Sequence, residues 1–287
     1  MIMRKIAFIT VSIALAGFLI YAISFHNKEI PVEAPGKVIA TSAYEKYFGA
    51  APTVNKGTAY AFVIYFPSKT TPGKVVPFPF FTFDEGSLKK VAVERLLGGM
   101  DIGSYQGEFI PFPSGIRLLA LNDALGTVTV NLSMGLDTTV GTALAHALDL
   151  TLRQFKGATD IRLQVEGKQQ PLSAVSGQAD GVVQQPSAPR LLSVNGMREK
   201  GATNIDEVNA FFDRPVDIKE LKLFSEDGHA FAGDMYHSVF DMAAVFRPKE
   251  PSQFKERTPV KVRWKVVDKL GRQAGGNSVW LLDVKEH

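Results

Sequence analysis

The strongest constraint on this chain is an uncharged apolar run close to its N-terminus, residues 6–25, which reads IAFITVSIALAGFLIYAISF. As an α-helix rising about 1.5 Å per residue, this run would be about 30 Å long, which matches the hydrocarbon layer of a bilayer. The sequence therefore predicts a transmembrane helix. The residues expected to anchor it in the membrane are Ile6, Phe8, Val11, Ile13, Leu15, Phe18, Leu19, Ile20 and Phe25.

Two basic residues predict how this helix is oriented. Arg4 and Lys5 precede the run, and positive residues favour the cytoplasmic side, so everything after His26 is expected outside the cytoplasm. An alternative is a cleaved signal peptide with Ala22 and Ser24 at its cleavage site, although the apolar region of such peptides is usually about 7 to 15 residues. A third alternative is a buried helix of a soluble protein. The first two alternatives both export the remaining chain.

Composition excludes several classes of protein. The 287 residues are 45% apolar and 21% charged, which is typical of globular chains and enough for roughly two domains. The net charge of +3 is too small for a dedicated nucleic-acid-binding protein. The chain has no cysteine, which excludes disulfides, thiolate metal sites, a catalytic cysteine and a lipid-modified cysteine.

Breaks in the hydrophobic pattern divide the chain into segments. Residues 31–57 carry scattered proline and glycine without a sustained period, which predicts a tether after a cytoplasmic tip and anchor at 1–30. Residues 171–189 read PLSAVSGQADGVVQQPSAP and have the composition of an interdomain linker. Two folded domains are therefore expected, at 58–170 and 190–287.

The first domain combines strand and helix patterns. Its first strand is apolar on both faces, which predicts a central position, and Pro77 and Pro79 place the second strand at a sheet edge. The helices follow from apolar residues spaced at i, i+3, i+4 and i+7. The order ββαββαβ indicates an α+β domain with two helices on one face of a sheet. The expected elements are strands at 59–66 and 75–83, a helix at 87–97, a hairpin at 116–121 and 127–132, a helix at 138–155 and a strand at 160–166.

Segments of this domain resemble the GerM-type (GerMN) domain over residues 58–170. The resemblance rests on YFPSK, VERLLGG, FPSGIRLLALNDALGTVTVNLS, LRQFKG and VEGK, in that order. It implies a small α+β domain related to the ring-building modules of envelope machines, which bind neighbouring proteins and have no known active site. Two departures limit the comparison, because the chain lacks the lipid-modified cysteine common in such proteins and has one copy where the sporulation protein has two. A ring or sporulation role is therefore not transferred.

The second domain is expected to be all-β. Short strands in about 98 residues predict an immunoglobulin-like (Ig-like) sandwich. FFDRPVD, LKLFSEDG and TPVKVRWKVVDKLGR resemble bacterial Ig-like domains of surface and copper-resistance proteins, which implies an adhesive or spacer role without enzyme activity. The first expected strand, at 208–212, is followed by a turn at 213–215 and by a second strand that begins at Leu221. Further strands are expected at 239–246, 260–266 and 279–284.

Motifs of catalysis are missing from the sequence. It contains no Gly-x-Ser-x-Gly, no phosphate-binding loop, no dinucleotide fingerprint and no His-Glu-x-x-His, so we expect no catalytic, cofactor or metal residues. His146, with Asp149 and Arg153 farther along its helix, could act as a base, but a solvated helix face is the favoured interpretation. A cell-wall enzyme would need Glu94, Glu108 or Asp149 to converge in one cleft.

Three groups of side chains are candidates for binding. One combines histidine, methionine and aspartate and would suit copper, although its methionines could instead fill a core. Another is a basic strand face that could meet an anionic glycan, a lipid headgroup or a phosphate chain, and is more often simply solvated. The third is a phenylalanine-rich set, expected mostly in the core. The groups are His229, Asp234, Met235, His237, Asp241 and Met242; Lys255, Arg257, Lys261, Arg263 and Lys265; and Phe78, Phe80, Phe81, Phe83, Phe109 and Phe112.

Taken together, the sequence favours a non-catalytic interaction or scaffold protein of the bacterial cell envelope. We expect a single-pass anchor in the cytoplasmic membrane, both domains outside the cytoplasm, and envelope proteins as partners, with a second copy of the chain among them. The assembly is left open between a sporulation- or germination-like one and a cell-wall-associated one. The alternatives are a module that binds cell-wall glycan or copper, and a cell-wall enzyme.

Overall fold

The computed structural model describes residues 36–99, 103–136, 141–170 and 179–286, all within one compact unit, Gly36–His287. The expected anchor at 6–25 lies outside the described residues. Among the residues that are described, no helix is long and apolar enough to cross a membrane.

The segment expected to be a tether is folded from residue 36 onward. Strand β1 (Lys37–Ala40) pairs in parallel with strand β2 (Thr58–Pro67), and helix α2 (Ser42–Phe48) connects the end of β1 to the segment before β2. The Thr41 hydroxyl accepts a hydrogen bond from the Tyr44 amide and so caps the helix. The prediction was wrong here because the helix buries Tyr44, Tyr47 and Phe48, and this single aromatic stripe is too short to show a sustained period.

Strand β2 is central in a three-stranded sheet of order β1-β2-β3, as its two apolar faces predict. Strand β3 (Val75–Thr82) is the edge strand that its prolines indicate. Its outer edge meets the segment expected to be a linker, where Val183 forms a bridge to Val75 and the Gln184 amide donates to the Val75 carbonyl at 2.8 Å. At least this part of the linker is therefore fixed to the first region.

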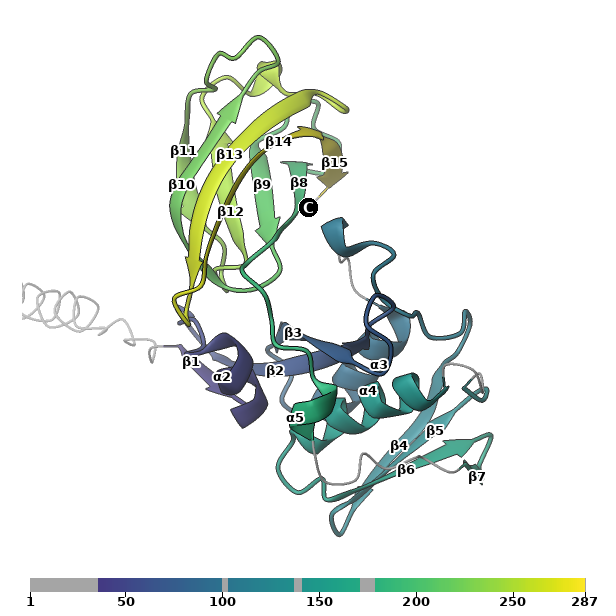
Figure 1. The fold of residues 1–287 in the computed structure, drawn as a ribbon. Helices are drawn as coiled ribbons and strands as arrows, with labels where there is room; N and C mark the ends of the chain where they lie inside the picture. Colours follow the sequence, from purple (N-terminus) through teal and green to yellow (C-terminus); the bar gives the residue numbers. More distant parts are fainter. Residues whose placement is uncertain (1–35, 100–102, 137–140, 171–178, 287) are drawn as a thin grey trace, which may run out of the picture. The chain divides into compact units, whose positions relative to one another are not determined.

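The order ββαββαβ is found from β2 to β6 and is followed by a short strand, β7, that was not predicted, and the layering also differs from the expectation. The other strands form a second sheet of order β4-β5-β6-β7, and helices α3 and α4 lie between the two sheets, where they contact β2 as well as β4 and β6 (Figure 1). Helix α4 is therefore buried nearly all round, and not along one stripe. These elements are α3 (Leu88–Gly98), the 3-10 turn η1 (Gly103–Tyr105), β4 (Leu118–Ala124), β5 (Thr127–Leu132), α4 (Gly141–Arg153), β6 (Asp160–Val165), β7 (Lys168–Gln170) and the short α5 (Ala179–Val182).

The C-terminal region is β-rich, as predicted. Two sheets, of orders β10-β13-β14 and β11-β12-β9-β8-β15, face each other across a second apolar core in which the Phe212 and Trp264 rings lie 5.4 Å apart. The strands are β8 (Leu191–Arg198), β9 (Glu207–Phe212), β10 (Val216–Phe224), β11 (Gly233–His237), β12 (Ala243–Pro248), β13 (Pro259–Asp268), β14 (Gln273–Leu281) and β15 (Asp283–Glu286), with a 3-10 turn, η2, at Pro251–Gln253.

Several strands of this region differ from the prediction. Strands β8 and β11 were not predicted, and β10 begins at Val216 and not at Leu221. Strand β12 starts at Ala243, because the residues before it form a turn that carries Phe240 onto the first region. The closing strand is two strands, since the chain leaves one sheet after Leu281 and joins the other at Asp283, with Leu282 buried between them. A local apolar pattern does not reveal such a change of sheet.

Candidate functional site

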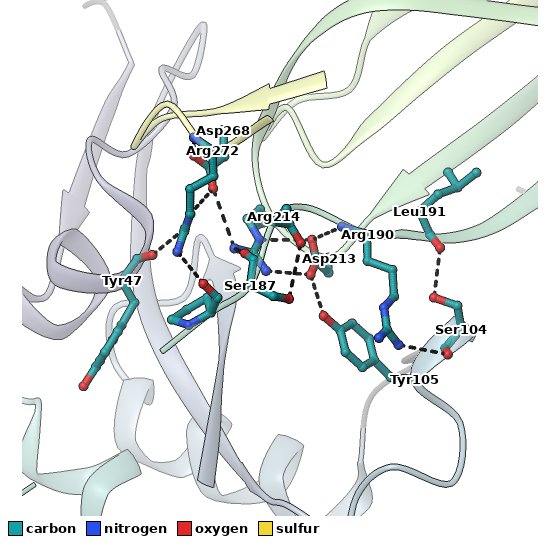
Figure 2. A network of polar contacts seen from close by, with 12 residues as sticks. Tyr47, Ser104, Tyr105, Ser187, Arg190, Leu191, Asp213, Arg214, Asp268 and Arg272 are labelled. Atoms are coloured by element: carbon teal, nitrogen blue, oxygen red, sulfur yellow. Dashed lines mark hydrogen bonds and ion pairs between the residues drawn. The ribbon is translucent and has the colours of Figure 1, made fainter. Parts of the chain in front are cut away.

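Charged side chains are buried where the first region meets the C-terminal β region, and Asp213 is their centre (Figure 2). Asp213 follows strand β9 and is 2% exposed. Its carboxylate accepts hydrogen bonds from the Arg190 amide at 3.0 Å and from the Tyr105 hydroxyl at 2.9 Å. Arg214 donates to both oxygens, at 3.0 and 2.8 Å. One carboxylate therefore joins η1, the start of β8 and the β9–β10 turn.

Arg214 extends this network toward the β13–β14 turn. Its Nη1 donates to the Ser187 carbonyl at 2.8 Å and lies 3.6 Å from Asp268. Burial opposes the charge of Arg214, but the hydrogen bonds and charge of Asp213 outweigh that effect, so the pKa of Arg214 lies above its usual value. Arg214 is therefore a permanent cation with fixed acceptors.

Arg272 closes the network on the other side (Figure 2). It donates to Asp268 at 2.6 Å, to the Pro186 carbonyl at 3.0 Å and to the Tyr47 carbonyl at 2.8 Å. The last contact joins the β13–β14 turn to helix α2, which is 225 residues away in the sequence. One guanidinium thus holds three separate segments of chain together.

Tyr105 and Arg190 form the end of the network near η1. The Arg190 guanidinium lies 3.8 Å from the centre of the Tyr105 ring and donates to Glu108 at 2.6 Å. Burial, with a further contribution from Asp213, raises the pKa of Tyr105 to about 12. Because its pKa is raised, the hydroxyl of Tyr105 stays protonated and donates to Asp213 over the ordinary pH range. Nearby, Ser104 donates to the Leu191 carbonyl at 2.9 Å.

An apolar contact lies beside the charged network. The rings of Phe81 and Phe240 stack at 4.5 Å with an interplanar angle of 8°, and Phe83 lies 5.6 Å from Phe240. Gly49, at the end of helix α2, lies against Leu270 of the β13–β14 turn, because a Cβ on Gly49 would be 3.1 Å from the Leu270 side chain. We call the charged network and these contacts together the junction.

The junction encloses a cavity of about 80 Å³, lined in part by Ser68, Glu108, Gln184 and Arg190. Ligand pockets usually measure roughly 300–1,000 Å³, so this space suits a few water molecules. Its polar groups are mainly bonded to one another, which indicates a structural joint between the two regions.

Two larger grooves flank helix α3. One, of about 690 Å³, lies between the start of α3 and strand β4 and includes Leu119, which is 50% exposed. The other, of about 640 Å³, lies between the end of α3 and residues 107–116, and Leu97 and Ile110 are among its apolar residues. Strand β4 is an edge strand of its sheet. An edge strand beside a partly apolar groove is a surface on which an extended peptide can dock.

The predicted solvated face around His146 is wrong in part. Asp149 is fully buried and is held by Arg153 through Nε contacts of 2.9 and 2.7 Å, whereas His146 is half-buried. The error arises because α4 lies between two sheets, so the side opposite its apolar stripe is covered as well. Glu94 pairs with Lys90 on the surface and Glu108 pairs with Arg190, so these two and Asp149 have separate partners.

The histidine and methionine residues of the β region lie at several positions. His229 pairs with Asp227 at 2.8 Å in the β10–β11 turn, while His237 lies 3.6 Å from Asp241. Met235 is exposed on β11. Among the described residues, no three histidine or carboxylate side chains gather as a metal site would require.

The basic strand face and the phenylalanine set follow the sequence more closely. Lys261, Arg263 and Lys265 are exposed on β13, where they alternate with buried residues. Phe78, Phe109 and Phe112 are in the core, as expected for most of the set. Phe80 and Phe81 are partly buried, and Phe83 is exposed.

The junction residues were not predicted from the sequence. Asp213 and Arg214 lie in FFDRPVD, and Asp268 and Arg272 in VDKLGR, so their positions after strands were visible as turns. Turn residues are usually solvated. The sequence signal for the junction is that oppositely charged residues recur at one end of several strands. These residues are buried as pairs only because the first region covers that end, which the sequence does not reveal.

Comparisons with known proteins extend these observations. Residues 63–171 match the family model described as Germane: Sporulation and spore germination. None of the curated proteins matches the chain. The first GerMN domain of the sporulation protein GerM from Bacillus subtilis is 19% identical, covering 40% of this chain and 90% of its own, with a TM-score of 0.32.

Two further solved structures are similar to larger or different parts of the chain. The tandem GerMN domains of the Bacillus subtilis protein are 14% identical, covering 69% of this chain and 63% of theirs, with a TM-score of 0.34. PcoC, a methionine-rich copper resistance protein from Escherichia coli, is 17% identical, covering 34% of this chain and 100% of its own, with a TM-score of 0.25.

Proposed function

We propose that this chain, in which residues 63–171 form a GerM-type domain, is a non-catalytic scaffold protein of the bacterial cell envelope. A helix at 6–25 anchors it in the cytoplasmic membrane with the N-terminus inside. The GerM-type domain and the C-terminal β region, an Ig-like domain, lie outside the cytoplasm and present a joint surface to envelope proteins.

The junction is the observation that carries this proposal. Arg190, Arg214 and Arg272 each contact the opposite region or the segment between the regions. The Arg214–Asp213 pair among them is buried, and breaking a buried pair is costly, so these contacts favour a fixed arrangement of the two regions. A fixed pair of domains suits a scaffold, because it presents two surfaces at a constant spacing and loses little conformational entropy when partners bind.

The groove beside strand β4 supports protein partners over small molecules. Its residues include the exposed Leu119 and the charged Lys89 and Asp123, which pair with each other. Edge backbone groups give affinity to an added strand, and neighbouring side chains give selectivity. A peptide segment of another envelope protein, or of a second copy of this chain, is the ligand that such a surface fits.

Topology is tested first, by cysteine labelling in intact cells. The chain has no cysteine, so one introduced thiol reports one position. A membrane-impermeant maleimide is expected to label Leu125→Cys, at an exposed turn, without permeabilisation, and to label Arg4→Cys only after permeabilisation. Labelling of Leu125→Cys only in permeabilised cells would overturn the exported orientation.

Partner binding is tested by placing a photo-cross-linking amino acid at Leu119 in the groove, at Met235 on strand β11 and, as a control, at Leu125 in the β4–β5 turn. We expect discrete adducts with envelope proteins from Leu119 that the control lacks. A Leu119 probe that captures nothing beyond the control would contradict the groove as a docking surface. If Met235 gave no adduct either, the scaffold role would fail.

A further inference from the structure

The outer face of the sheet β10-β13-β14 is basic. Directly paired residues of neighbouring strands point to the same side of a sheet, so the register defines which side chains share this face with the cations of β13. Lys261 is paired with Phe224 and Val279, Arg263 with Lys222 and Asn277, and Lys265 with Glu220 and Gly275.

The positive charge of this face is only partly neutralised. Glu220 is the carboxylate among the residues paired with these cations, and it lies 2.9 Å from Arg263 and 4.0 Å from Lys222. Asp217, farther along the same face opposite Val267, pairs with Lys269 at 2.7 Å. Among the described residues, no carboxylate forms an ion pair with the exposed Lys261 or Lys265. The face therefore carries excess positive charge that is available to an anionic surface.

Apolar side chains lie beside these cations. Val279 is 65% exposed and Leu281 is 54% exposed, and both are on the edge strand β14. Phe224 is half-buried, with the Arg263 guanidinium 5.3 Å from its ring centre. A sheet face that combines lysine and arginine with exposed aliphatic and aromatic groups has the composition of surfaces that bind at a lipid headgroup layer.

We propose that this basic face docks on a bilayer that contains anionic phospholipid, as a second membrane contact besides the N-terminal anchor. The proposal rests on the proposed function for its geometry. Ten residues, 26–35, separate the expected anchor from the first described residue, and they can span at most about 35 Å. With the proposed anchor in the bilayer, this length of chain would keep the folded unit near the membrane.

The attachment point favours this face. The described chain begins at Gly36, next to strand β1, and helix α2 follows. Arg272 in the β13–β14 turn donates to the Tyr47 carbonyl of helix α2 (Figure 2). Strand β13, which carries Lys265, Arg263 and Lys261, thus extends from the end of the β region that adjoins the start of the folded chain.

The experiment uses the full chain reconstituted in vesicles of neutral phospholipid, with or without anionic phosphatidylglycerol, and with spin-labelled lipid as a fluorescence quencher. Val279→Cys carries a fluorophore on the basic face, and Met235→Cys, on the other sheet, is the matched control. We expect quenching of the Val279 label that depends on anionic lipid and decreases at high salt, with little change at Met235.

Charge variants test the cause. Neutralising Lys261→Gln with Lys265→Gln leaves the Arg263–Glu220 pair intact and is expected to weaken docking at least about tenfold, as judged from the anionic lipid needed for half-maximal quenching. The exposed pair Lys200→Gln with Lys249→Gln removes the same charge elsewhere and is expected to leave docking unchanged.

Equal quenching at Val279 in neutral and anionic vesicles would overturn the proposal. Binding of soluble polyphosphate without a response to anionic lipid would also overturn it and would assign the face to a wall polymer. Failure of the chain to float with neutral vesicles would contradict the anchor alone, because anionic vesicles still report on the face. Absence of both signals would contradict both proposals.

Discussion

The junction and the basic face use the same kinds of side chain in opposite ways. At the junction, the side chains of Arg214 and Asp268 are 4% and 1% exposed and lie within a connected set of ion pairs. On the basic face, Arg263 and Lys222 are 46% and 55% exposed and share one carboxylate. The residue types alone do not separate the two surfaces.

Burial makes the difference, because it sets the cost of an unpaired charge. A buried guanidinium without an acceptor costs several kcal/mol, whereas an exposed one stays hydrated. Pairing is therefore required at the junction and optional on the face. Charges left unpaired on the face remain available for a partner, and the following variants probe this contrast.

The largest effect is expected from Asp213→Ala. It leaves Arg214 and the Tyr105 hydroxyl buried without their acceptor and should lower the free energy of unfolding by about 3–5 kcal/mol in urea denaturation. Glu220→Ala on the basic face is the control, with an expected loss of about 0.2–1 kcal/mol. Similar losses for the two variants would show that the junction charges are not effectively buried.

A smaller effect is expected from Gly103→Ala. A Cβ there would lie 2.2 Å from the Leu192 carbonyl oxygen, and the φ angle of +44° also disfavours a side chain. We expect a loss of about 1–3 kcal/mol and faster proteolysis of residues 184–190. Gly107→Ala has φ +81° but open space around its Cβ, so it isolates the backbone effect. Equal losses would show that close packing of η1 on β8 contributes nothing.

The pH dependence of stability should also report on the junction. Burial raises the pKa of Tyr105 to about 12, whereas an unfolded tyrosine loses its proton near pH 10. Only the native state keeps this proton between those two pH values. The contribution of protonated Tyr105 to the free energy of unfolding is therefore full below pH 10 and is lost as the pH rises to about 12. Tyr105→Phe should flatten the fall of the unfolding free energy over this window. An unchanged slope would contradict the assignment.

The smallest effect is expected from Lys261→Gln with Lys265→Gln. Both side chains are exposed, so the free energy of unfolding should change by no more than about 0.5 kcal/mol in urea denaturation, although docking on anionic vesicles is weakened. A loss above about 1 kcal/mol would show that these cations stabilise the fold and would weaken the contrast with the junction.

Strands and helices with a strong local pattern were predictable, and α2 shows where prediction ended. Strand β2 was recognised as central because both of its faces are apolar, and β13 because Val260, Val262 and Trp264 alternate with cations. Helix α2 was assigned to a tether. Its burial depends on packing against β2 and Phe81, which are distant in sequence, so a seven-residue window carries too little signal.

Composition and local period are enough to identify the charge-free run at 6–25, the absence of cysteine, the GerM-type pattern and the β-rich C-terminal region. The tertiary structure alone decided which charges are buried. Asp213, Arg214, Asp268 and Arg272 lie in turns or at strand ends, and their partners Tyr105, Ser187, Pro186 and Tyr47 belong to the first region or to the segment between the regions. The first region covers this end of the two sheets and excludes water from it. The charged residues there therefore pair with one another and join the two regions.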